Sequence, residues 1–361
     1  MKTNETETDS NAIQKNNNIN KSRVLPQDKL MTVAFSPYIK GSETTSTIMA
    51  DVIIATIPAL LWGIYIFGFR ALSLTVISVV SCVFFEFIYQ LVMKKTKTVT
   101  DLSAVVTGIL IAFTLPVNVP LWIPIAGGAF AIIIVKQLFG GIGKNIVNPA
   151  IAARIFLSIS FPKYIAVFFD ISKEKLAPFV IQPEIDALVG ATPLTALKEG
   201  LMPSAYGFEL FDMILGQKSG AIGEISAVML LVGAVYLMIR KVITWHVPLS
   251  FIGTVAALAY FLPQNEDMFN FCLNEIFAGG LLLGAFFMAT DYVTSPITKS
   301  GKLIFGIGCG VITIFIRYFG AYPEGVSFAI MIMNLFVWYI DKLTKPVKFG
   351  GRGDVKQRQP K

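Results

Sequence analysis

Ten apolar stretches run through this sequence, and several are about 20 residues long, the length that an α-helix needs to cross a lipid bilayer. Only 15% of the 361 residues are charged, whereas soluble domains carry about a quarter. The sequence therefore predicts an all-α polytopic membrane protein with about ten transmembrane helices. The stretches are Ile48–Phe69, Ala71–Val92, Leu102–Leu115, Leu121–Phe139, Pro149–Phe161, Gly220–Ile239, Val242–Leu262, Ile276–Thr290, Leu303–Phe319 and Val326–Ile340.

A polar segment divides the ten stretches into two sets of five. In each set the third and fifth stretches are short, at 13 to 15 residues, which fits half-helices or tilted segments better than full spans. Because five is an odd number, a second copy of the set enters the membrane upside down, as in transporters built from inverted repeats. We expect two inverted five-helix repeats with short or broken helices. Ten helices without internal symmetry are the alternative.

The predicted organisation has five regions. Residues 48–161 and 220–340 form the two five-helix repeats, and residues 162–219 between them form a loop. Residues 1–47 form a polar N-terminal tail, and residues 341–361 form a basic C-terminal tail.

Lysine and arginine predict the orientation of the chain, because short cytoplasmic loops are enriched in them. With both tails in the cytoplasm, 22 of the 30 lysines and arginines lie on that side and seven on the other. This count places Lys136 on the cytoplasmic side, and Arg70, Lys218 and Arg317 on the other side. We therefore expect a multi-pass protein of the cell inner or plasma membrane with its 162–219 loop outside the cytoplasm. The net charge of +7 reflects this orientation and not binding of nucleic acid.

Residues that bind metal ions are few and scattered. The chain has three cysteines (Cys82, Cys272 and Cys309) and one histidine (His246), with no C-x-x-C pair. A metal centre needs several converging thiolate or imidazole ligands. We expect no metal ion or iron–sulfur cluster held by this chain.

The predicted loop contains the sequence DALVGATPLT at residues 186–195. In the simplest interpretation Thr192 is the N-cap of a helix that Pro193 opens, with Gly190 in the preceding turn. A helix N-terminus also presents free N–H groups and the positive end of the helix dipole, which stabilise a phosphate group. Small residues at Gly190 and Ala191 leave the Thr192 hydroxyl approachable. The pattern is compatible with a cap and with phosphate attachment.

The segment from Asp186 to Thr192 resembles the D-x-x-[ST]-G-A-T signal on which a flavin transferase esterifies FMN, through its phosphate, to the threonine hydroxyl. One position differs, because Val189 stands where Ser or Thr is usual. With DLSAVVTGILIAFTLP and GGIGKNIVNPAIAAR, the chain is similar to the family of the Rnf D subunit and of the B subunit of the sodium-pumping NADH:quinone reductase. The resemblance implies covalent FMN on Thr192, with Asp186, Gly190 and Ala191 completing the attachment site.

A second motif, GGIGKNIVNP, links the fourth and fifth apolar stretches. By itself it predicts a glycine-rich connection in which Asn148 caps a helix opened by Pro149. In the related quinone reductase subunit, paired asparagines in a matching segment lie near a non-covalent riboflavin. The resemblance therefore implies Asn145 and Asn148 as contacts of a bound riboflavin.

Five ionisable residues fall within or at the edges of the apolar stretches: Asp51, Glu86, Arg154, Glu224 and Asp291. Such residues are costly in a membrane and are functional candidates by default. In the structural alternative Arg154 pairs with a carboxylate and the others lie at helix ends in headgroup water. That alternative is favoured for Asp51, Glu224 and Asp291, and both interpretations stay open for Glu86 and Arg154. A cation route through Asp51 and Glu224 is a further hypothesis.

The resemblance implies an integral-membrane flavoprotein subunit of the Rnf complex. Such a subunit relays electrons between ferredoxin and NAD, coupled to Na⁺ or H⁺ translocation, and is not active alone. It implies the other Rnf subunits (A, B, C, E and G), a flavin transferase and membrane lipids as partners, and no catalytic side chain on this chain. The alternatives are a B-type subunit of a Na⁺-translocating NADH:quinone reductase, a stand-alone inverted-repeat transporter, and a passive membrane scaffold.

Overall fold

The computed structural model describes residues 44–95, 98–169, 189–190, 192–264, 267–320 and 322–346. Helices dominate these residues, as predicted. The strands among them are β1 (Phe168–Phe169) and β2 (Val189–Gly190), which form one antiparallel pair of two residues each. The pair places Val189 and Gly190, which belong to the DALVGATPLT segment, beside Phe168 and Phe169.

Four described helices are long and apolar enough to cross a membrane: α2 (Thr45–Phe67), α3 (Phe69–Val92), α14 (Lys299–Phe319) and α15 (Val326–Thr344). A fifth span is broken, because α12 (Met268–Phe277) meets α13 (Leu281–Leu283) and the π-helical η5 (Gly284–Met288) at an angle of 60°. The shorter apolar helices are α4 (Ser103–Phe113), α5 (Trp122–Ala129) with the π-helical η3 (Phe130–Gln137), α6 (Pro149–Ser160), α10 (Ala227–Ile239) and α11 (His246–Phe261). Each of the ten apolar stretches thus corresponds to one of these helices or broken helices, as expected of a multi-pass membrane protein.

The lengths of these helices confirm part of the predicted pattern and correct part of it. The short third and fifth helices of the first half are present as α4 and α6, and the third helix of the second half is broken. The fifth helix of the second half, α15, was predicted to be short but has 19 residues. The apolar stretch stops at Ile340, but the helix continues through Asp341 and Lys342. These charged side chains are tolerated there because this end of the helix is partly exposed. Helix α10 begins only at Ala227, because residues 220–226 form turns.

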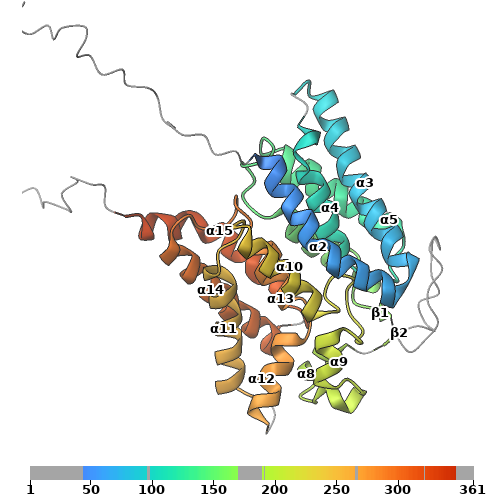
Figure 1. The fold of residues 1–361 in the computed structure, drawn as a ribbon, viewed down its shortest axis with the longest axis vertical. Helices are drawn as coiled ribbons and strands as arrows, with labels where there is room; N and C mark the ends of the chain where they lie inside the picture. The colour runs from blue at the N-terminus through green and yellow to red at the C-terminus, as the bar shows by residue number, and fades with distance from the viewer. Residues whose placement is uncertain are drawn as a thin grey trace, which may run out of the picture. The chain divides into compact units, whose positions relative to one another are not determined.

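The two halves pack by the same pattern. In each half the second helix lies against the third and the fourth, namely α3 against α4 and α5, and α11 against α12 and α14. Between the halves, the first helices α2 and α10 pack together, and so do the fifth helices α6 and α15. In Figure 1 the blue-to-cyan helices of the first half lie beside the gold-to-red helices of the second half.

Short helices connect the two halves: α7 (Pro162–Ile165), α8 (Pro193–Lys198), the 3₁₀ turn η4 (Pro203–Tyr206) and α9 (Leu210–Leu215). Another 3₁₀ turn, η2 (Val99–Asp101), precedes α4. Helices α8 and α9 both pack against α12, and α9 also packs against α10. The connection is therefore attached to the second half at the end where α12 begins (Figure 1).

Helix α4 ends inside the protein, where its last carbonyl groups need hydrogen-bond donors. The carbonyl oxygens of Phe113 and Leu115 accept hydrogen bonds from the backbone N–H groups of Gly223 (2.9 Å) and Ile222 (3.1 Å). A β-carbon at Gly223 would lie 2.4 Å from the side chain of Phe113, so this close approach requires glycine. Residues 220–226 are thus held against the end of α4.

Helix α12 also ends inside the protein, and two cations satisfy its carbonyl groups. Arg317 on α14 donates to the main-chain oxygen and carboxylate of Glu275, and to the carbonyl oxygen of Ala278 at 3.3 Å. Lys218, which precedes residues 220–226, donates to the carbonyl oxygen of Phe277. Because an unsatisfied backbone group costs several kcal/mol inside a membrane, these bonds make the break in α12 possible.

Several cations of the basic count are buried. Lys136 is in η3, where it forms an ion pair with Glu86, and is 3% exposed. Arg70 is fully buried and donates to the carbonyl oxygen of Val119 at 2.7 Å. Lys218 and Arg317 are buried at the end of α12. Three of these cations donate hydrogen bonds to main-chain carbonyl oxygens, and Lys136 pairs with a carboxylate. A count of lysines and arginines does not detect such contacts.

We predict that Arg317→Leu destabilises the protein by about 3–5 kcal/mol, because it leaves the Glu275 carboxylate buried without its cation. The melting temperature of the purified protein in detergent measures this loss. Lys299→Leu is the matched control, since Lys299 is an exposed cation on the same helix. Equal melting temperatures for the two variants would contradict this account of the broken helix.

Candidate functional site

Thr192 caps α8, as its position before Pro193 predicts. Its backbone is extended, and its Oγ1 accepts a hydrogen bond from the Thr195 N–H at 3.2 Å. The hydroxyl groups of Thr192 and Thr195 are 2.7 Å apart. Gly190 does not form the predicted turn, because its backbone is in β2, opposite Phe168. The other two predicted attachment residues, Asp186 and Ala191, lie outside the described residues.

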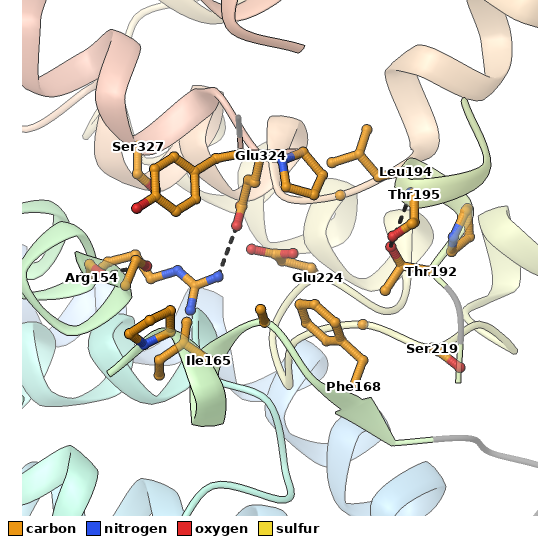
Figure 2. Close-up of a pocket in the computed structure, with 18 of the residues that line it drawn as sticks. Arg154, Ile165, Phe168, Thr192, Leu194, Thr195, Ser219, Glu224, Glu324 and Ser327 are labelled. Atoms are coloured by element: carbon orange, nitrogen blue, oxygen red, sulfur yellow. Dashed lines mark hydrogen bonds and ion pairs between the residues drawn. The ribbon is translucent and has the colours of Figure 1, made fainter. Parts of the chain in front are cut away.

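Thr192 lines a cavity of about 110 Å³ between the two halves of the chain. This is several times the roughly 10–15 Å³ that one water molecule needs. Its walls combine apolar side chains with a few converging polar ones, as in most small-molecule sites. Figure 2 shows Glu224 in the middle of this site, with Arg154 on one side and Thr192 on the other. The apolar walls include Ile155, Ile165, Phe168, Leu194 and Phe328.

Two cations and two carboxylates meet at this cavity. Arg154 on α6 forms an ion pair with Glu324, with Nη2 2.9 Å from Oε2. Its other terminal nitrogen, Nη1, is buried and has no hydrogen-bond partner among the described residues. Lys218 is also buried, and burial lowers the pKa of its ammonium group to about 8. The arrangement thus offers positive charge to an anionic group next to the Thr192 hydroxyl.

The sequence pointed to only part of this set. Arg154 and Glu224 were candidates because they interrupt apolar stretches, and the ion pair of Arg154 agrees with the structural alternative for that residue. For Glu224 the favoured alternative, a position in headgroup water, is wrong, because its side chain is 6% exposed and lines the cavity. Glu324 and Lys218 were missed, because both occur in short polar connections where charged residues are ordinary. The signal that could have found Glu324 is the need of a buried Arg154 for a partner.

Asn145 and Asn148 line a second cavity of about 90 Å³, formed by α2, α4 and the segment around Asp291. Asn148 caps α6 as predicted, accepting from the Ala150 N–H at 3.0 Å. Its amide also donates to the carbonyl oxygen of Met288, at the end of η5, at 3.2 Å. Asn145 donates to the carbonyl oxygen of Val147 at 3.1 Å. The two asparagines therefore share a cavity, and Asn148 also has a structural role.

The remaining ionisable candidates have partners in the described residues. Glu86 accepts from Lys136 and from Gln137, each at 2.8 Å. Asp51 accepts from Tyr236 at 2.8 Å and from Arg240 at 3.1 Å.

The hypothesis of a cation route linked Asp51 with Glu224. The partners of Asp51 are at the C-terminal end of α10, whereas Glu224 precedes the N-terminus of that helix. The structure does not bring these two acids together. Asp291 borders the second cavity and accepts from the Thr294 hydroxyl at 3.0 Å.

Metal ligands do not gather in the described part of the chain, where no group of three or more His, Cys, Asp or Glu side chains is placed to hold a metal ion. Cys82, Cys272 and Cys309 are free thiols.

These features define the class of protein: a multi-pass α-helical membrane protein with a broken span and two cavities between its helices. The profile of the NQR2, RnfD, RnfE family matches residues 32–350. The chain therefore belongs to the NQR2, RnfD, RnfE family.

Three relatives illustrate this membership. The chain is 44% identical over 323 residues to the D subunit of the Na⁺-translocating ferredoxin:NAD⁺ oxidoreductase complex of Acetobacterium woodii, covering 89% of this chain and 95% of that one. It is 38% identical over 332 residues to the D subunit of the proton-translocating ferredoxin:NAD⁺ oxidoreductase complex of Clostridium ljungdahlii, covering 90% and 97%. It is 37% identical to the D subunit of the ion-translocating oxidoreductase complex of Stutzerimonas stutzeri, covering 84% and 91%.

Proposed function

We propose that this chain is the D subunit of an ion-translocating ferredoxin:NAD⁺ oxidoreductase complex and carries FMN esterified to Thr192. The proposal rests on the position of Thr192. This residue matches the threonine of the flavin attachment signal, and it lines the same cavity as Arg154 and Lys218. Similarity over 84–90% of the chain to three D subunits of ion-translocating oxidoreductase complexes, two of them named for ferredoxin:NAD⁺ oxidoreduction, supports the assignment to the complex. It also favours a D subunit over a B-type subunit of the quinone reductase.

The residues of the cavity fit a phosphate ester at Thr192. The ester would carry a negative charge, and the unpartnered Nη1 of Arg154 and the buried ammonium of Lys218 are cations in the same cavity. The aromatic and aliphatic walls, including Phe168 and Phe328, suit the apolar part of a flavin. When bound, FMN supplies the electron-transfer chemistry. The chain's own residues hold the group and set its electrostatic surroundings.

The shared packing pattern of the two halves supports the proposal of two inverted five-helix repeats, at residues 48–161 and 220–340. The third helices, α4 and α12, both end inside the protein. Broken helices of this kind line the central sites of inverted-repeat membrane proteins. A stand-alone transporter would share this architecture but would not need covalent flavin. A passive scaffold would not need it either.

The orientation is also a proposal, with both tails cytoplasmic and the 162–219 loop on the other side of the membrane. Of the buried cations, Lys136 was counted on the cytoplasmic side and the other three on the opposite side. When these four are left out of the count, the cytoplasmic side still has the excess of lysine and arginine. The Thr192 cavity would then open to the extracytoplasmic side. The cavity of Asn145 and Asn148, which we propose as a riboflavin site, would lie towards the cytoplasm.

We predict that Ser204→Cys reacts with an impermeant thiol reagent added to intact cells, because Ser204 is an exposed residue of the loop. Ser300→Cys, exposed at the start of α14, is the matched control and should be labelled only after lysis. Both variants are made in a background without the partly exposed native Cys272. The reverse labelling pattern would overturn the orientation.

Asn145→Ala should lower the riboflavin content of the purified complex and leave covalent FMN unchanged. Asn145 lines the second cavity and does not line the Thr192 cavity. Asn148→Ala should lower riboflavin too and also cost about 0.5–2 kcal/mol of stability, since it removes the cap of α6. Extraction of the non-covalent flavin followed by chromatography measures both. Full riboflavin content in the assembled double variant would make the segment a structural turn only.

Thr192→Ala should abolish covalent flavin, because alanine has no oxygen to carry the phosphate. Flavin fluorescence that survives denaturing electrophoresis is the measurement. Membrane insertion should persist, since losing the cap costs only about 0.5–2 kcal/mol. Ferredoxin-dependent NAD⁺ reduction by matched membranes should fail.

Thr195→Ala is the matched control, because Thr195 lines the same cavity and contacts the Thr192 hydroxyl. This variant should keep both its flavin and its activity. Covalent flavin on the Thr192→Ala protein, or full activity without it, would contradict the proposed function.

A further inference from the structure

Glu224 and Glu324 form a close pair of carboxyl groups in the Thr192 cavity. A β-carbon placed on Gly280 would lie 2.4 Å from Oε1 of Glu224 and 2.6 Å from Oε1 of Glu324. Both oxygens therefore converge on the same point above a glycine backbone. Figure 2 shows the two carboxyl groups close together in the middle of the site. Two ionised carboxylates at this separation repel, so one of them is expected to be neutral.

The surroundings decide which of the two is neutral. Oε2 of Glu324 accepts from Arg154 at 2.9 Å, which stabilises Glu324 in its ionised form. Oε1 of Glu224 is buried and has no hydrogen-bond partner among the described residues, and Glu224 as a whole is 6% exposed. A buried carboxylate oxygen without a donor is costly. Protonation removes this cost, because it converts Glu224 into a donor with Glu324 as acceptor.

Helix ends and cations surround Glu224. Glu224 follows directly on the residues that bind the C-terminal end of α4, and Gly280 follows the C-terminal end of α12. The cations that face the pair are Arg154 on α6 and Lys218, and Arg317 on α14 lies near Lys218. Arg154 pairs with Glu324, and Lys218 and Arg317 donate to the end of α12.

We propose that Glu224 is a proton-binding site. At neutral pH its carboxyl group is protonated and donates a hydrogen bond to the carboxylate of Glu324. In the loading step a hydronium ion in the cavity transfers its proton to Oε1 of Glu224, giving a carboxylic acid and a water molecule. The cavity has room for that water. A proton needs only one oxygen lone pair, whereas a hard metal cation needs about six oxygen ligands. The pair, with one oxygen already bound to Arg154, therefore suits a proton.

This proposal goes beyond the proposed function, since it requires no flavin on Thr192. A proton-binding carboxyl group at this position gives the chain a proton-exchange site within reach of the cavity water. It also predicts that the charge of the cavity changes by one unit when the site is emptied, next to the residue that we propose as the flavin carrier.

Infrared spectroscopy of the purified complex, titrated from about pH 5 to about pH 9, tests the proposal. The carbonyl stretch of a protonated carboxyl group should persist well above the range of an ordinary glutamate, whose pKa is about 4.3. The band should shift in D₂O and disappear in Glu224→Gln. Glu209→Gln is the matched control, because Glu209 is an exposed acid of the same connection, and it should keep the band. Covalent flavin is scored on the same samples, so that failure of either proposal is seen separately.

Glu224→Asp keeps the carboxyl group but withdraws it from Glu324 by one methylene group, so its band should change frequency. This variant decides the question if Glu224→Gln does not assemble. An unchanged band in both variants would overturn the proposal. So would carboxylate bands of Glu224 that respond to NaCl but not to choline chloride at constant pH, because Na⁺ would then occupy the site.

Discussion

The structure depends on how the interrupted helices satisfy their free carbonyl groups. The end of α4 is bound by the backbone of Ile222 and Gly223, and the end of α12 by Arg317 and Lys218. Inside a membrane such groups have no water to bind, so a helix can stop there only where the protein provides donors. Residues 218–223, which precede α10, contribute donors to both helix ends. They therefore fix the two halves of the chain to each other.

The candidate site follows from the same constraint. Because Lys218 is bound to the end of α12 and residues 222–223 to the end of α4, Glu224 is placed in the cavity that Thr192 reaches from α8. Arg154 enters from α6 and Glu324 from the connection before α15, so both halves contribute charge. The site is consequently made of residues that are far apart in the sequence but adjacent to breaks in helices. Lys218 serves both purposes, since it donates to α12 and lines the cavity.

Apolar periodicity and capping chemistry were sufficient to predict the helices and two caps, because these depend on neighbours in the sequence. Thr192 and Asn148 cap α8 and α6 as expected. Local patterns do not reveal how charges pair over long distances. The pairing of Lys136 with Glu86 was therefore not predicted, and Glu324 was missed although it pairs with Arg154. The length of α15 was underestimated for a related reason, since a charged residue ends an apolar stretch without ending the helix.

Mass spectrometry of the native complex can locate the FMN that we propose on Thr192. Trypsin should release residues 176–198, a peptide that contains both Thr192 and Thr195. Fragmentation before Pro193 separates the two, because the fragment from Pro193 to Lys198 retains only Thr195. We expect a peptide heavier by one esterified FMN whose Pro193–Lys198 fragment is unmodified. An unmodified peptide from the active complex, or FMN on the Pro193–Lys198 fragment, would contradict it.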